Sequence, residues 1–208
     1  MVEKLVVFVE EYSMEAALEI LLPKLLNGVT FQIIRFQCKN DMLKQLPLRL
    51  KGYSSWLPAN WSILVLVDRD DDDCKELKRE LEKHCATAGL LTRTAAKTGQ
   101  KFKVTNRIVI EELESWYFGD WQAVKTAYPK VNANIAGKAA YRDPDLIKGG
   151  TWEALERVLK NSGYFSTGLR KIECARTVTP HMNVNVNRSK SFNVFHQAIT
   201  KILNGSIG

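Results

Sequence analysis

The sequence lacks several features that would place it in a familiar class. Its four cysteines include no Cys-x-x-Cys pair and lie far along the chain from the three histidines. No apolar stretch approaches the roughly 18 residues that cross a bilayer, and no Gly-x-x-x-x-Gly-Lys phosphate loop is present, so the sequence does not predict ATP hydrolysis. The N-terminus has acids at positions 3 and 10 and no small-residue cleavage site, which predicts a first strand and not a signal peptide. We therefore expect a cytoplasmic protein with reduced thiols.

Acidic residues are scarce in the second part of the chain, residues 121–208. Residues 1–120 carry 17 Lys and Arg against 18 Asp and Glu, whereas residues 121–208 carry 13 against 5. The net charge of +7 thus comes from the second part. A basic surface attracts polyanions by releasing their counterions, and nucleic acid is the commonest polyanion in a cytoplasm.

Apolar runs alternate with segments of helical spacing in residues 1–120, which predicts an α/β fold with a mainly parallel sheet flanked by helices. Residues 52–60 and the basic segment 97–103 are expected to be loops. The predicted strands are 4–9, 29–37, 61–67, 90–95 and 106–112. The predicted helices are 13–26 with Ser13 as N-cap, 41–51 interrupted at Pro47, 73–88 closed by Gly89, and 114–118.

The pattern weakens beyond residue 120, where only 121–128, 151–162 and 193–203 have helical spacing. Residues 132–150 and 162–188 are expected to be irregular. We interpret residues 1–120 as a core and 121–208 as a basic, helical or irregular extension packed on the same domain. Trp116, Tyr117, Phe118 and Trp121 have the spacing of one buried helical face, and Ser189 with Phe192 suggests a helix cap with a packing anchor.

The segment 61–73 contains the densest group of acidic residues in the sequence, directly after an apolar run. Five aliphatic residues at 63–67 predict a strand covered on both faces, and five carboxylates follow within six residues. Asp71, Asp72 and Asp73 suit the start of the next helix. Asp68 and Asp70 suit either that role or a site for a hard cation such as Mg²⁺ or Mn²⁺.

Two further predicted strands also end in acids. Residue 9 is followed by Glu10 and Glu11, and residue 110 by Glu111, Glu112 and Glu114. The carboxyl ends of parallel strands share one rim, where neighbouring strands are about 4.8 Å apart. Carboxylates from several strands in a basic chain are typical of two-metal phosphoryl transfer, in which lysines or arginines hold the phosphate backbone.

These motifs resemble the TOPRIM fold of topoisomerases, bacterial primases and the overcoming-lysogenization-defect nucleases. The matching elements are Val9-Glu10 before a helix start at Ser13, Val67-Asp68-Arg69-Asp70, and Glu112-Leu-Glu114. The resemblance covers roughly residues 1–120. It is greatest to small stand-alone TOPRIM-like proteins of unknown function, in which a segment similar to Glu112-Leu-Glu114-Ser-Trp116 recurs. Glu11 stands where the family usually has Gly, and Met14 where it often has an acid.

The resemblance implies a nuclease that uses Mg²⁺ or Mn²⁺ to hydrolyse nucleic-acid phosphodiesters, DNA more than RNA, in bacterial or archaeal defence beside an ATPase partner. It implies that Glu10, Asp68, Asp70, Glu112 and Glu114 are metal ligands. Glu10 is also a candidate general base or acid, Glu114 a catalytic candidate, and a late lysine, for which Lys171 is our candidate, would stabilise the phosphate.

The expected nucleic-acid contacts come from two groups of basic side chains. Lys97, Lys101 and Lys103, with Arg107, form a basic patch expected beside the third acidic strand, and Arg170, Arg176 and Arg188 lie in the basic extension.

Two alternatives to a nuclease remain. One is a catalytically degenerate nucleic-acid-binding or regulatory subunit of an ATPase-containing complex. The other is a receiver phosphorylated on Asp68, which needs a lysine at the end of a further strand, and the sequence offers no good candidate for that lysine.

Overall fold

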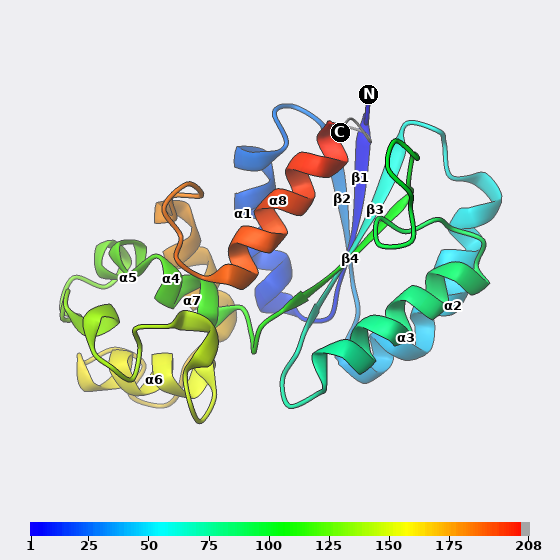
Figure 1. Cartoon of the computed structure of the whole chain (residues 1–208). Helices are drawn as coiled ribbons and strands as arrows, with labels where there is room; N and C mark the ends of the chain where they lie inside the picture. Colours follow the sequence, from blue (N-terminus) through cyan, green and yellow to red (C-terminus); the bar gives the residue numbers. More distant parts are fainter. Residues whose placement is uncertain (205–208) are drawn as a thin grey trace.

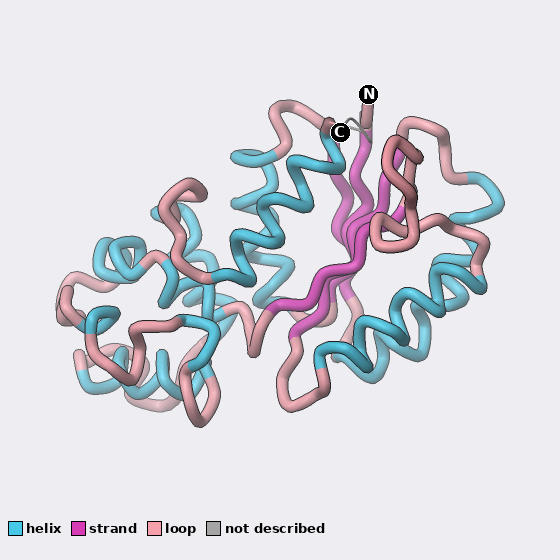
Figure 2. The backbone as a smooth tube through the Cα atoms, viewed as in Figure 1, coloured by secondary structure: helices cyan, strands magenta, loops and turns pink. Residues whose placement is uncertain are grey.

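The fold is a three-layer α/β arrangement around a four-stranded parallel sheet (Figures 1 and 2). The computed structural model describes residues 1–204. The strands are β1 (Lys4–Val9), β2 (Thr30–Arg35), β3 (Trp61–Asp68) and β4 (Val104–Val109), in the order β2-β1-β3-β4. Every neighbouring pair is parallel. The expected α/β class with a parallel sheet is therefore confirmed.

The two faces of the sheet are covered by different helices. Helices α1 (Tyr12–Leu25) and α8 (Lys190–Leu203) lie on one face, and α2 (Lys39–Trp56) and α3 (Cys74–Thr87) on the other (Figure 1). Alternate residues of β1 point to opposite faces, so Leu5, Val7 and Val9 belong to one hydrophobic cluster and Val6 and Phe8 to the other. Burial on both faces explains why the central strands are continuously apolar.

The rest of the chain forms short helices beside α1 and α8, gathered at the lower left of Figure 1. One hydrophobic cluster contains residues from the sheet, α1 and these helices alike. Within residues 1–204, no helix is both long and apolar enough to cross a membrane. The remaining elements are α4 (Glu114–Gly119), α5 (Trp121–Ala127), η1 (Ile135–Gly137), η2 (Pro144–Leu146), α6 (Thr151–Asn161), α7 (Lys171–Val178) and η3 (Thr179–His181).

Tertiary packing overrides two of the local predictions. Helix α2 continues through Pro47 and Gly52, and the loop expected at 52–60 begins only after Trp56. A proline inside a helix loses one backbone hydrogen bond, but Met42, Leu46 and Leu50 are fully buried against the sheet and hold the helix together. The strand expected at 90–95 is wrong, because only a single bridge between Thr92 and Val104 forms there.

Two further predictions about helix positions are wrong. Ser13 is not the N-cap of α1, because the helix begins one residue earlier and Glu11 takes the cap position. The hydroxyl of Ser13 instead donates to the Glu11 carboxylate. The segment 162–188, expected to be irregular, contains α7, whose Cys174, Ala175 and Val178 are buried against α1 and its neighbours.

The expected caps of α3 and α8 and the aromatic core are confirmed. Asp73 accepts hydrogen bonds from two backbone N–H groups at the start of α3, and Ser189 accepts one from Phe192 at the start of α8. Trp116, Tyr117 and Phe118 are completely buried in the core.

Candidate active site

The acidic ends of β1 and β3 meet in the middle of the sheet. These strands are neighbours, and the chain leaves them in opposite directions, toward β2 and β4. Ligand sites of open α/β sheets form at such a switch point, outside the carboxyl ends of the strands. The side chain of Glu10 reaches the backbone of the next strand, where its Oε1 accepts a 2.7 Å hydrogen bond from the N–H of Asp68. The expected proximity of Glu10 and Asp68 is therefore confirmed.

The segment after β3 is held by the chain that follows β4. The N–H of Arg69 donates to the carbonyl of Val109 at 2.9 Å, and the N–H of Asp70 donates to that of Glu111 at 3.1 Å. The Arg69 guanidinium also pairs with the Glu111 carboxylate at 2.6 Å. Asp70 and Glu111 both have φ of 48°, a left-handed conformation that non-glycine residues rarely adopt and that concentrates at functional sites.

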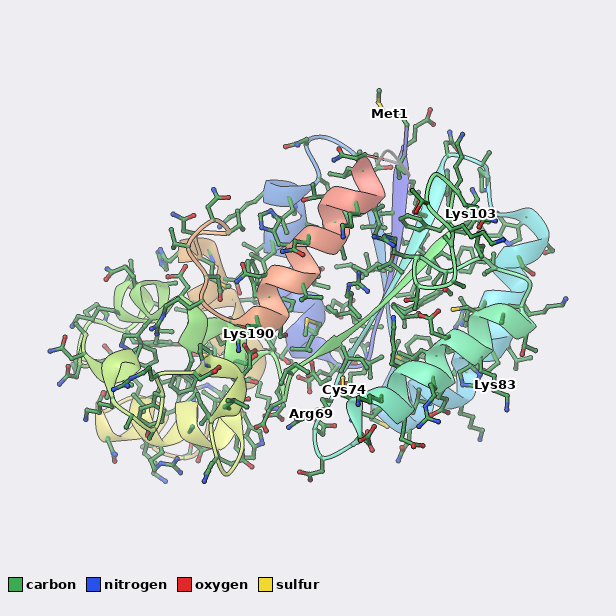
Figure 3. The ribbon with its side chains drawn as sticks, in the orientation of Figure 1. Met1, Arg69, Cys74, Lys83, Lys103 and Lys190 are labelled. Carbon is green, nitrogen blue, oxygen red and sulfur yellow. The ribbon has the colours of Figure 1, made fainter. Side chains whose placement is uncertain are left out.

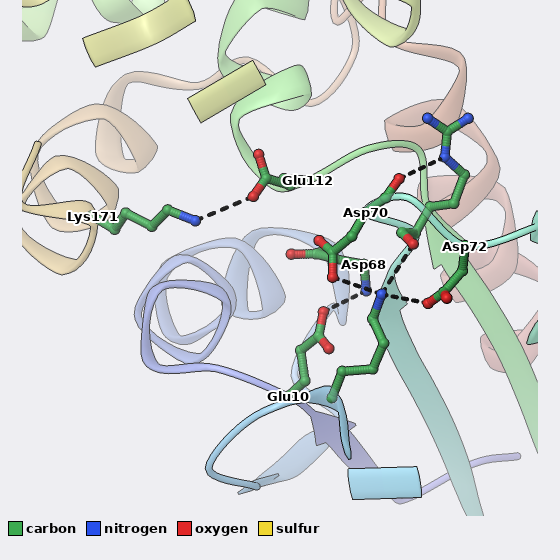
Figure 4. A network of polar contacts seen from close by, with 8 residues as sticks. Glu10, Asp68, Asp70, Asp72, Glu112 and Lys171 are labelled. Atoms are coloured by element: carbon green, nitrogen blue, oxygen red, sulfur yellow. Dashed lines mark hydrogen bonds and ion pairs between the residues drawn. The ribbon is translucent and has the colours of Figure 1, made fainter. Parts of the chain in front are cut away.

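An acidic cleft of about 500 Å³ opens above these strand ends. Figure 4 shows Glu10, Asp68, Asp70 and Asp72 gathered on one side of the polar network, with Glu112 and Lys171 on the other. The acids outnumber the bases in the lining, which consists of Glu10, Glu11, Gln37, Cys38, Lys39, Asn40, Asp68, Asp70, Asp71, Asp72 and Glu112.

The buried carboxylates of residues 1–204 fall into two classes. Asp120 and Asp145 accept hydrogen bonds on both oxygens, from backbone N–H groups and a serine hydroxyl. Glu10, Asp68 and Glu114 are also buried, yet each has one oxygen without a hydrogen-bond partner. Burying a carboxylate without partners is costly. Three such groups near one cleft are expected of a site that receives a cation or a proton and not of a structural network.

Burial also changes the acidity of these three groups. Desolvation raises the pKa of Glu10 to about 7, although the Asp68 N–H and Lys39 oppose the change. Desolvation, followed by the charge of Glu10, raises the pKa of Asp68 well above its ordinary value. Desolvation raises the pKa of Glu114 to about 7, with Lys171 opposing it. Such displaced pKa values are typical of functional sites.

A lysine pairs with Glu112, one of the residues that line the cleft. Lys171, the first residue of α7, lies 3.3 Å from Oε1 of Glu112, while Oε2 of Glu112 accepts from the N–H of Trp152 at 3.2 Å. Burial by itself would lower the pKa of Lys171, but the negative charges of Glu114, Glu11 and Glu112 raise it above the ordinary value. The structure therefore places the candidate Lys171 beside the third acidic motif, as a charged ammonium.

The carboxylates do not yet surround a single point. Within residues 1–204, no three His, Cys, Asp or Glu side chains are arranged closely enough to hold a metal ion as they stand. Asp70 is instead paired with Lys39 at 2.6 Å. The carboxylate oxygens nevertheless suit a hard cation, because Glu10 and Asp68 each have a buried oxygen without a hydrogen-bond partner.

Lys39 is the residue of this site that the sequence analysis missed. It follows β2, and β2 is the other neighbour of β1, so its loop reaches the same rim. The position of Lys39 could have been predicted from the sequence, because every loop that follows a strand of a parallel sheet lies at the carboxyl edge of that sheet. Lys39 lies after a strand that does not end in acids, and for this reason it was not among the predicted site residues.

The expected nucleic-acid contacts are not at the acidic rim. Lys103 donates to the carbonyls of Pro58 and Ala59 at the amino end of β3, and Figure 3 shows it toward the same end of the sheet as Met1, away from Arg69 at the carboxyl end. The 97–103 loop, which contains Lys97 and Lys101, directly precedes β4, so the expected basic patch adjoins this strand at its amino end. A parallel strand carries its preceding loop to the opposite edge of the sheet.

The basic residues of the extension are dispersed. Arg170 pairs with Glu173, Arg188 donates to the carbonyl of Ala136, and Arg176 is exposed on α7. The structure does not gather these three with Lys171 into one patch at the cleft.

A family described as "Domain of unknown function (DUF4276)" matches residues 9–200 of the chain. The matched part includes the carboxyl ends of all four strands and the helices around the cleft, and it omits all of β1 before Val9. No curated protein and no solved structure matches the chain. Since the match covers well over half of the sequence, the chain belongs to the DUF4276 family.

Proposed function

We propose that the protein is a TOPRIM-like nuclease that depends on Mg²⁺ or Mn²⁺ and hydrolyses the phosphodiester bonds of nucleic acid, DNA more than RNA. The observation that carries the proposal is the pair of buried, partnerless carboxylate oxygens of Glu10 and Asp68 at the switch point of a parallel sheet. The TOPRIM likeness is supported by the positions of the three acidic motifs, which lie at or shortly after the carboxyl ends of β1, β3 and β4.

Each acidic motif has a role in this proposal. Glu10, Asp68 and Asp70 would hold one cation, and Glu112 and Glu114 would form a second group of ligands. Bound divalent cations would supply the positive charge that activates water and stabilises the leaving oxygen. Glu114, with a pKa of about 7, is suited to exchange a proton near neutral pH. Lys171 pairs with Glu112, which lines the cleft, and would hold the phosphate, which a charged ammonium does as a point charge.

One observation favours a different function. The Lys39 ammonium lies 2.6 Å from Asp70 and 2.8 Å from Asp72, so a protein cation already neutralises part of the site. This arrangement suits a catalytically degenerate subunit, which binds nucleic acid or regulates a partner ATPase and needs no metal. The two functions predict different results in a cleavage assay.

The test is cleavage of plasmid and single-stranded DNA by purified protein with and without Mn²⁺. We expect metal-dependent cleavage by the wild type and none by Asp68→Asn. Glu19→Gln, an exposed position on α1, is the charge-matched control and should cleave as the wild type does. Absence of cleavage by the wild type, together with metal-independent binding of the same DNA, would favour the degenerate subunit.

A further inference from the structure

Lys39 is placed as a cation inside the acidic cleft. It is the first residue of α2, and its side chain is only 13% exposed. Its ammonium lies 2.6 Å from Oδ2 of Asp70 and 2.8 Å from Oδ2 of Asp72, and donates to the carbonyl of Arg69 at 3.0 Å. Three oxygens from one loop thus surround the nitrogen, as a lysine needs for its three donors.

The charge balance of the cleft gives this lysine a specific importance. Of its lining residues, all within the described part of the chain, seven are acids and Lys39 is the one base. The charge of Glu10 also acts on Lys39, although the two make no direct bond in the structure. The ammonium therefore neutralises the same group of carboxylates to which the proposed function assigns a divalent cation.

The contacts of Asp70 bring a competing positive charge to a proposed metal ligand. Asp70 has a left-handed backbone conformation, its N–H donates to the carbonyl of Glu111, and the residue lines the cleft. Its Oδ2 is within 2.6 Å of Lys39. A divalent cation bound by the same carboxylate would face an ammonium at close range, in a cleft where such repulsion is only partly screened.

We propose that Lys39 is an internal counter-ion that competes with the divalent cation for Asp70, so that metal enters the site only by displacing the lysine. This inference rests on the proposed function, since it takes Asp70 as a metal ligand. Asp72 remains as an anchor for the displaced ammonium, because its carboxylate is about half exposed and lies 2.8 Å from the nitrogen of Lys39. Lys39 thereby sets the affinity of the site for the metal. When no metal is bound, it pairs with the carboxylates of Asp70 and Asp72.

The experiment is calorimetric titration of Mn²⁺ into wild type, Lys39→Met and Lys39→Arg, with no nucleic acid present. Lys39→Met should bind Mn²⁺ about tenfold more tightly or better, because the competing charge is gone. Lys39→Arg keeps the charge and should not bind more tightly than the wild type. Lys44→Met is the matched control, since Lys44 is an exposed lysine on the same helix and is not among the lining residues of the cleft.

The outcomes separate the two proposals. If the wild type binds Mn²⁺ and Lys39→Met binds it no more tightly, the competition is refuted and the metal site stands. If none of the four proteins binds Mn²⁺, the metal site itself fails, and the competition with it. Binding by Lys39→Met alone would support the competition and show that the native site is held closed. Lys39→Gln replaces Lys39→Met if circular dichroism shows that the methionine variant is unfolded.

Discussion

Glu10→Gln is expected to make the metal-free protein more stable at alkaline pH, although it alters the proposed site. Glu10 is 6% exposed, and burial raises its pKa from 4.5 to about 7. Between these two values the folded state keeps a proton that the unfolded state has lost, so stability falls as pH rises through this window. Over roughly 2.5 pH units, the loss amounts to about 3 kcal/mol.

Glutamine cannot ionise and so avoids this loss, and its Oε1 can still accept the hydrogen bond from the N–H of Asp68. We therefore expect Glu10→Gln to exceed the wild type by up to about 3 kcal/mol at pH 8 and to match it near pH 4.5. For a chain of this size, that corresponds to roughly 6 to 12 °C in the unfolding midpoint.

The assay is urea unfolding in the presence of a chelator at pH 4.5 and pH 8, with Glu19→Gln as the exposed control. The control should differ from the wild type by less than about 0.5 kcal/mol at both pH values. Added Mn²⁺ should stabilise the wild type by about 2.7 kcal/mol at 100 times its dissociation constant, and Glu10→Gln by much less. If Glu10→Gln is no more stable than the wild type at pH 8, the reasoning from burial is refuted.

Gly119→Ala and Asp73→Ala test the packing and the cap of α3. A Cβ at Gly119 would lie 2.0 Å from the side-chain oxygen of Asn187 and 2.8 Å from the backbone nitrogen of Ser189. Gly119→Ala should therefore lower the free energy of unfolding by about 1–3 kcal/mol, measured in urea. The control Gly137→Ala, whose Cβ would meet open space, should not lower it. Asp73→Ala removes the cap of α3 and should cost about 1 kcal/mol. Calorimetry should find its Mn²⁺ affinity unchanged, and a loss of affinity would assign Asp73 to the site.

The sheet and its acidic rim could be predicted because their signals are local. Continuous apolar runs mark β1 and β3, and the acids come directly after the strand. A parallel sheet then brings distant acids to one edge without any knowledge of side-chain contacts. This is why Glu10 and Asp68, which are 58 residues apart, could be expected together and are joined by a hydrogen bond.

The predictions that failed depend on contacts that local sequence does not encode. Pro47 predicts a break, but the burial of Leu46 and Leu50 sustains α2. The side on which a loop lies also depends on the direction of its strand. The basic residues before β4, among them Lys103, are therefore at the amino edge, while Lys39, after β2, reaches the acidic cleft.

The two classes of buried carboxylate yield a last prediction that needs neither metal nor nucleic acid. Asp120 accepts backbone N–H donors on both oxygens, at 3.3 and 2.7 Å. Asp120→Asn would turn an amide donor toward one of them and should cost about 1–3 kcal/mol. Asp68 has an unpartnered oxygen and a raised pKa caused by desolvation, so Asp68→Asn should instead stabilise the protein at pH 8.

The comparison is urea unfolding of both variants at pH 8 with a chelator present. Opposite signs of the change in unfolding free energy are expected, because the same chemical substitution removes a needed acceptor in one place and an uncompensated charge in the other. A structural role for Asp68 would give both variants the same sign. Since substituting a purely structural residue rarely raises stability, a gain at Asp68 would indicate that the fold keeps this carboxylate at a cost in stability, as proteins do at functional sites.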